Sequence, residues 1–136
     1  MSGVRGLAPP RPATWQSRAD WFWRAHDINA GPQPLDLDAQ ATLLLDELEV
    51  AYCAGAWAAV VILAWTLVEA ALRQAGDDAQ PTSDVDWLRA QRNGLVHIGS
   101  AAEIPDEAGM EALAQGALRV AFKTLYAVAW TSGPAP

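Results

Sequence analysis

Basic residues are scarce in this chain. Nine Lys and Arg residues stand against sixteen Asp and Glu residues, so the formal net charge is −7 and the pI is near 4.6. Proteins that hold nucleic acid over a broad surface use many Lys and Arg side chains against the phosphates. The composition therefore argues against a broad electrostatic grip on nucleic acid, and any RNA chemistry has to rely on a local basic patch. The candidates for that patch are Arg89, Arg92, Arg119 and Lys123.

Cysteine and the common catalytic motifs are equally scarce. The single cysteine, Cys53, has no partner for an internal disulfide and stands among apolar residues, which predicts a buried structural thiol in a reducing cytoplasm. The sequence contains no Cys/His cluster with zinc spacing, no glycine-rich phosphate loop and no Gly-x-Ser-x-Gly elbow. No apolar stretch follows Met1, so no secretory signal is expected. We expect a cytoplasmic protein without a metal or another cofactor.

Apolar residues at helical spacing fill most of the chain. With 136 residues, of which 51% are apolar and 18% are charged, the chain has the size and composition of one globular domain with one core. Apolar residues recur at intervals of three and four, which predicts an all-α bundle of four to five helices. The expected helices span about 15–27, 38–52, 56–75 and 106–130, with one more that begins at Ser83 or Asp84.

Capping residues and turn residues predict where the domain begins and ends. Thr14 is expected to cap the first helix, and Asp36 or Asp38 the second. The predicted organisation is a flexible Pro/Gly-rich tail at 1–13, a helical domain at 14–130 and a disordered tail at 131–136.

The first helix is rich in tryptophan. Trp15, Phe22 and His26 fall at helical spacing, with further tryptophans between them. Aromatic side chains at this density can stack on nucleic-acid bases, but packing onto the bundle or against a second subunit explains them more economically. His26 stands beside Asp27 near the predicted helix end, where we expect it to be solvated.

One long uncharged stretch raises the question of a membrane span. Val50 to Val68 are nineteen consecutive uncharged residues, enough to cross a bilayer as one helix. Gly55 predicts a turn near the start of this stretch, and no cluster of Lys or Arg marks a cytoplasmic side. We therefore expect a helix at 56–75 that is buried at the centre of the bundle and ends at Gly76.

A short polar motif interrupts the apolar pattern at Arg92-Asn93-Gly94-Leu95-Val96-His97. At roughly 100° per residue, a helix here separates apolar and polar side chains, with Arg92 at the edge of the polar stripe. The apolar side is predicted to hold Trp87, Leu88, Leu95 and Ile98, and the opposite side Asp86, Arg89, Asn93 and His97.

The spacing Arg92-Asn93-x-x-x-His97 resembles the signature of HEPN domains, small helical bundles whose active site is an Arg followed four to six residues later by a His. The helical hairpin before the motif and the long helix after it are similar to the order of helices in that family, over about residues 36–130. The tryptophan-rich helix is an addition to it. The resemblance implies a metal-independent ribonuclease with Arg92, Asn93 and His97 in its site, and Arg89 in support.

The resemblance also implies partners. HEPN sites are usually completed by pairing two copies, so a homodimer acting on RNA is expected, with an antitoxin or a nucleotidyltransferase as partner if the chain serves defence or a toxin–antitoxin pair. Some HEPN toxins carry a Tyr two residues after the His, which the nucleotidyltransferase modifies; Gly99 stands there in this chain and argues against that modification. The second hairpin helix often carries a Glu in the family, which implies that Glu69 orients the basic residues. Alternatively, Glu69 begins the solvated end of its helix.

Residue chemistry agrees with such a site. RNA cleavage without metal needs a base for the 2′-hydroxyl proton, an acid for the leaving oxygen and positive charge beside the phosphorus. The imidazole of His97 suits proton transfer, the forked guanidinium of Arg92 suits phosphate, and Asn93 suits holding either. The alternative is an inactive HEPN-like module that binds a nucleotide or a protein partner, which the net charge of −7 favours.

Overall fold

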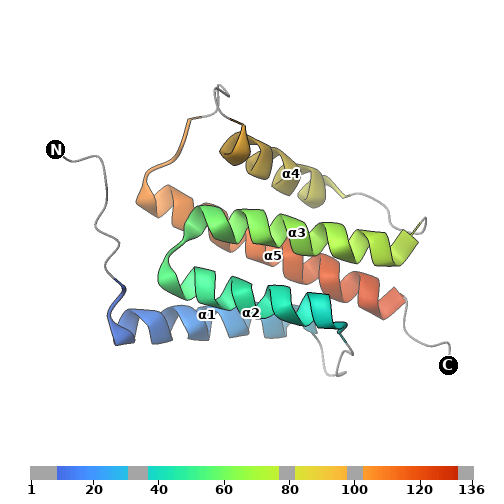
Figure 1. Cartoon of the computed structure of the whole chain (residues 1–136), viewed down its shortest axis with the longest axis horizontal. Coiled ribbons are helices and arrows are strands. Elements are labelled where there is room, and N and C mark those ends of the chain that lie inside the picture. The colour runs from blue at the N-terminus through green and yellow to red at the C-terminus, as the bar shows by residue number, and fades with distance from the viewer. Residues whose placement is uncertain (1–8, 31–36, 77–81, 98–102, 132–136) are drawn as a thin grey trace.

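A computed structural model describes residues 9–30, 37–76, 82–97 and 103–131, with backbone alone at 128–131. Within these residues every element of regular secondary structure is a helix. Its helices are α1 (Pro12–Ala30), α2 (Ala39–Ala54), α3 (Trp57–Ala75), α4 (Ser83–Val96) and α5 (Glu107–Thr131). Helices α3 and α5 lie side by side at the centre, α1 and α2 cover one side of this pair, and α4 lies on the other side (Figure 1). The prediction of an all-α bundle is confirmed.

The helix ends follow the local chemistry of capping. Asp38 caps α2, because its Oδ1 accepts a hydrogen bond from Ala41 N at 2.7 Å, as predicted. Gly55 ends α2 with a φ of 78°, which is the left-handed conformation that favours glycine, and it makes the tight turn into α3. Gly76 ends α3 with a φ of 66°. The predicted turns at both glycines are therefore confirmed.

One helix start differs from the prediction. α1 begins at Pro12 rather than after Thr14, so the last residues of the expected tail belong to the helix. Proline is well placed in the first turn of a helix because it lacks the N–H that would have no partner there and its φ is already helical. α4 begins at Ser83, as predicted, and is capped by Thr82, whose Oγ1 accepts from Val85 N at 3.2 Å. The alternative cap Asp36, residues 1–8 and residues 132–136 lie outside the described residues.

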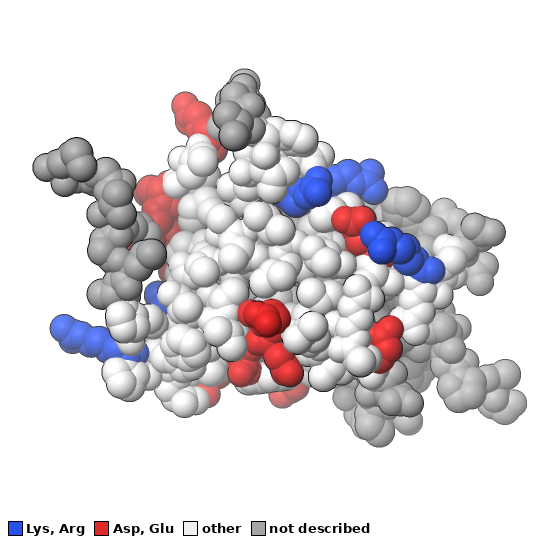
Figure 2. All heavy atoms as spheres, viewed as in Figure 1, with Lys and Arg blue, Asp and Glu red and all other residues white. Residues whose placement is uncertain are grey.

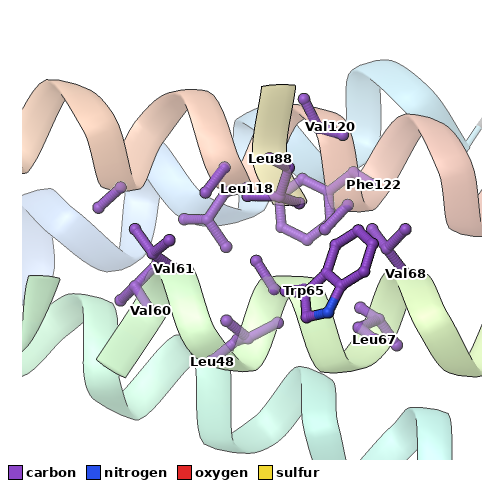
Figure 3. Close-up of a cluster of buried hydrophobic side chains, with 14 of the residues drawn as sticks. Leu48, Val60, Val61, Trp65, Leu67, Val68, Leu88, Leu118, Val120 and Phe122 are labelled. Atoms are coloured by element: carbon purple, nitrogen blue, oxygen red, sulfur yellow. The ribbon is translucent and has the colours of Figure 1, made fainter. Parts of the chain in front are cut away.

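The core is centred on the contact between α3 and α5. Eight residues of α3 are buried, and α5 contributes three fully buried alanines, Ala114, Ala117 and Ala121. Side chains of α2, α3, α4 and α5 meet in one apolar cluster around Trp65 (Figure 3). The buried residues of α3 are Trp57, Val60, Val61, Ala64, Trp65, Leu67, Val68 and Ala71. The helix expected at 56–75 is the core helix, but eight of its nineteen residues are buried and one side of it is exposed, so burial on nearly all sides is not observed. Cys53 is buried, as predicted.

Of the described helices, α3 alone is long and apolar enough to cross a membrane by length and composition. Its outward surface is largely uncharged, while acidic side chains gather over α2 (Figure 2). The core helix of a bundle passes the same test, and α3 packs against α2, α4 and α5.

Truncation of Leu88 tests how α4 is attached. Leu88 and Val85 are the buried residues of α4, and Leu88 is 0% exposed. We expect Leu88→Ala to lower the free energy of unfolding by about 2–5 kcal/mol in urea titrations, because it leaves a cavity beneath the helix. The control Val96→Ala removes a side chain that is 39% exposed at the end of α4 and should change stability by less than about 0.5 kcal/mol. Equal effects of the two substitutions would show that α4 is not held by this contact.

Candidate functional site at the end of α4

Helix α4 presents its motif at one end of the bundle. Val85 and Leu88 are buried, and Leu95 packs partly buried against the core. Arg92 falls on the same side of the helix, at intervals of three and four from these residues, and it is half-buried. Arg92 therefore lies closer to the buried side of α4 than its expected place at the edge of the polar stripe.

Trp87 also departs from the predicted face, because it is 38% exposed. Its ring lies against the backbone of Gly116 in α5, where an added Cβ would come within 3.0 Å of Trp87 Cη2. The missing side chain at Gly116 therefore leaves room for the indole against α5. Ile98, the last member of the predicted apolar side, lies outside the described residues.

Asn93 connects the two ends of the motif. Arg92 Nη1 donates a hydrogen bond to Asn93 Oδ1 at 2.8 Å, in a partly buried setting. The backbone N–H of His97 donates to Asn93 O at 3.1 Å and closes the last turn of α4. Asn93 therefore holds the Arg92 guanidinium with its side chain and the position of His97 with its carbonyl.

His97 lies just beyond the helix. The helix ends at Val96, and His97 has an extended backbone, with a φ of −93° and a ψ of 108°. Its side chain is exposed, and within the described ranges no side chain forms a hydrogen bond with the imidazole. The prediction that His97 projects outward agrees with this placement, although the residue caps the helix instead of continuing it.

The two supporting residues have partners outside the motif. Glu69 Oε2 accepts from Arg73 Nη2 at 3.2 Å, so it pairs one turn along its own helix. Arg89 lies 5.2 Å from the centre of the Trp65 ring and 3.9 Å from Asp86. The structure therefore links Arg92 to Asn93 through their side chains and His97 to Asn93 through the backbone, and it leaves Glu69 and Arg89 in contacts of their own.

A second polar cluster joins α1 to α5. The side chain of His26 is only 13% exposed, its Nδ1 lies 3.1 Å from Asp27 Oδ1, and its Nε2 is hydrogen-bonded to the Tyr126 hydroxyl. The ring also packs edge-on against Phe122. The prediction of a solvated His26 is wrong, because α5 covers a helix end that looks exposed when α1 is considered alone.

The other aromatic residues of α1 divide between core and surface. Phe22 is fully buried, and Trp21 stacks on Tyr52 with ring centres 5.1 Å apart. Trp15 and Trp23 remain 38% and 39% exposed. Packing onto the bundle therefore accounts for Phe22 and Trp21, as predicted, but not for all the aromatic surface of the helix.

The chain was compared with protein-family models, with curated protein sequences and with solved structures, and none of them matches it. The site is therefore defined by its own geometry. In the part of the chain that the structure describes, no three His, Cys, Asp or Glu side chains gather as metal ligands would. What the end of α4 offers is a positioned guanidinium, an amide and an accessible imidazole.

The tyrosine between α1 and α5 gives folding a pH dependence. Burial, together with the nearby Asp27 carboxylate, raises the pKa of Tyr126 above its ordinary value of 10.0. Because the folded-state pKa lies above the unfolded one, the stabilising contribution of this group is complete below about pH 10 and is lost as the pH rises through the folded-state pKa. We expect wild type to lose more stability than Tyr126→Phe between about pH 9 and 11, measured by urea unfolding. Parallel losses would mean that Tyr126 is not held neutral by the fold.

Proposed function

We propose that the chain is a metal-independent RNA endonuclease of HEPN type, acting in the cytoplasm, with its site at the end of α4. The observation that supports this most directly is the double role of Asn93, which fixes Arg92 through its side chain and His97 through its backbone. Such a connection places a permanent positive charge and a titratable imidazole at one helix end. Cleavage of a phosphodiester without a metal ion needs both of these groups, one to stabilise charge and one to transfer a proton.

In the proposed reaction, the 2′-hydroxyl of the RNA attacks the neighbouring phosphorus. The His97 imidazole accepts the hydroxyl proton, and the Arg92 guanidinium pairs with the phosphate oxygens on which negative charge develops. The bond from phosphorus to the 5′-oxygen breaks, a proton is delivered to that oxygen, and the products are a 2′,3′-cyclic phosphate and a free 5′-hydroxyl. Asn93 keeps the guanidinium in position.

One imidazole cannot accept the first proton and donate the second in the same step. A two-fold pairing that brings together two ends of α4 would supply one imidazole as base and the other as acid. The exposed position of His97 supports this arrangement, because the side chain is accessible to a second copy and to a substrate. We therefore include a homodimer in the proposal.

Loss of either functional group tests the cleavage. We expect purified wild type to cut single-stranded RNA in the presence of a chelator, and Arg92→Ala and His97→Ala to lower the rate by about 100-fold or more, since charge stabilisation and proton transfer each contribute that much. The control Arg73→Ala removes the same charge from a side chain that is 75% exposed on α3 and should cleave like wild type.

Thermal melting separates the nuclease from the inactive alternative. Because the His97 side chain is exposed, His97→Ala should melt at the wild-type temperature while losing cleavage. If wild type leaves RNA intact and His97→Ala melts at a lower temperature, the motif holds a helix or subunit contact, and the chain is an inactive HEPN-like module that binds a nucleotide or a protein partner.

Dilution tests the paired site. If two copies of His97 act in one groove, activity per chain should fall as wild type is diluted below the concentration at which the dimer dissociates. Light scattering on the same samples gives the dimer fraction, and the two curves should coincide. Constant activity per chain in samples that are monomeric would contradict a site shared between copies.

A further inference from the structure

A groove between α1 and α5 gathers basic side chains in a protein that has few of them. The groove has a volume of about 320 Å³. Three of the nine Lys and Arg residues of the chain line it, and no Asp or Glu is among its described lining residues. The lining residues are Trp21, Arg24, Ala25, Ile28 and Asn29 from α1, and Arg119 and Lys123 from α5. The groove is separate from the α4 motif, and none of these residues takes part in the proposed cleavage.

Helical spacing explains why these side chains meet. Trp21, Arg24 and Ile28 recur at intervals of three and four, so they share one side of α1. Arg119 and Lys123 are four residues apart and share one side of α5. Because α1 and α5 run in the same direction side by side, the two rows face a common groove (Figure 1).

The three cations differ in how they are held. Arg119 lies 5.2 Å from the centre of the Trp21 ring, which fixes its guanidinium against the wall. Lys123 forms an ion pair with Asp84 at 3.2 Å, but both side chains are at least half exposed, so water weakens the pair. Arg24 is exposed, and no side chain of the described residues pairs with it. Among the described residues, the groove therefore contains one guanidinium without a side-chain partner beside two cations that already have a position.

The rest of the wall is apolar or neutral. Trp21 and Ala25 form an apolar surface, and Ile28 is 78% exposed at the rim. Asn29 donates from Nδ2 to Ala25 O at 3.1 Å, which leaves its Oδ1 to accept a hydrogen bond from a ligand. A ligand that satisfies this wall needs an anionic group for the cations, a flat or apolar part for the indole and isoleucine, and a donor for Asn29.

We propose that this groove binds a small aromatic phosphate ester such as a nucleoside monophosphate. Phosphate oxygens would pair with Arg24 and Lys123, and the base would lie against Ile28 and the guanidinium of Arg119, which stacks on Trp21. The volume is near the lower end for ligand pockets, roughly 300 Å³, so a single nucleotide suits it better than a polymer. The local cluster offsets the repulsion that a net charge of −7 exerts on an anion.

Calorimetric titration of the full chain with AMP, adenosine and inorganic phosphate tests the proposal. AMP should bind at least about tenfold more tightly than either of the other two, because it alone engages both the cations and the apolar wall. Inorganic phosphate or adenosine binding as tightly as AMP, or no binding of AMP at millimolar concentration, would overturn it.

Charge-removal variants locate the site. Arg24→Gln and Arg119→Gln should each weaken AMP binding by at least about tenfold, since each removes a charge-assisted contact. Arg11→Gln is the matched control, because Arg11 is also exposed but lies about 20 Å away, at 1.5 Å per residue along α1. Its AMP affinity should equal that of wild type. Equal weakening by Arg11→Gln and Arg24→Gln would mean that AMP responds to overall charge and not to the groove.

RNA cleavage distinguishes this site from the one on α4. Arg24→Gln should bind AMP weakly and cleave RNA at the same rate as wild type. His97→Ala should bind AMP with the affinity of wild type. A loss of AMP binding in His97→Ala that melts like wild type would contradict a separate groove.

Discussion

The close packing of α3 against α5 determines where every other helix can lie. Alanines at 114, 117 and 121 on α5 are fully buried against a helix rich in valine and leucine, and small side chains allow the two helix axes to approach closely. Without the other helices, this pair would expose apolar side chains on two sides. The aromatic surface of α1 and the leucines of α2 cover one of them, and the shorter α4 covers the other (Figure 1).

This division explains why the motif is accessible. α4 is attached through Val85 and Leu88, near its start and middle, while Leu95 is only partly buried near its end. The last turn therefore depends on local polar contacts for its shape, and Asn93 provides them. A helix end that is ordered by its own side chains can present functional groups to solvent without opening the core.

Sequence patterns predicted the helices and much of the core because those features depend on local spacing. The second helix shows this well: Ala41, Leu45, Leu48 and Tyr52 recur at intervals of three and four, and all four are buried. On the last helix, helical spacing predicts a core side formed by Met110, Leu113, Ala117, Val120, Ala121, Leu125 and Val128. Of these, Leu113 is partly buried and the others up to Leu125 are buried, but Leu118, Phe122 and Tyr126, which lie outside that set, are buried too. These three widen the buried stripe because α5 is covered by α1 as well as by α3, and the number of neighbours cannot be read from one helix. The side chain of Val128 lies outside the described residues.

The same limit applies to the functional residues. The motif was visible because Arg92, Asn93 and His97 are close in sequence, but the partly buried position of Arg92 depends on how α4 is rotated against the core. The sequence does not indicate that Arg24 and Arg119 lie in one groove, because they are ninety-five positions apart and meet only through the contact between α1 and α5. The hydrogen bond between His26 and Tyr126 joins residues one hundred positions apart and could not be predicted for the same reason.

The two candidate sites lie in different parts of the bundle, the motif at one end and the groove near the middle of α5, and the helix directions explain this separation. α4 runs opposite to α5, so the motif lies near the start of α5 (Figure 1). Arg119 is twelve residues beyond Glu107, about 18 Å along α5 at 1.5 Å per residue. Pairing two copies through the ends of α4 would consequently leave the groove between α1 and α5 open. A ligand in that groove could therefore bind each copy of a dimer without competing with a substrate at the paired motif.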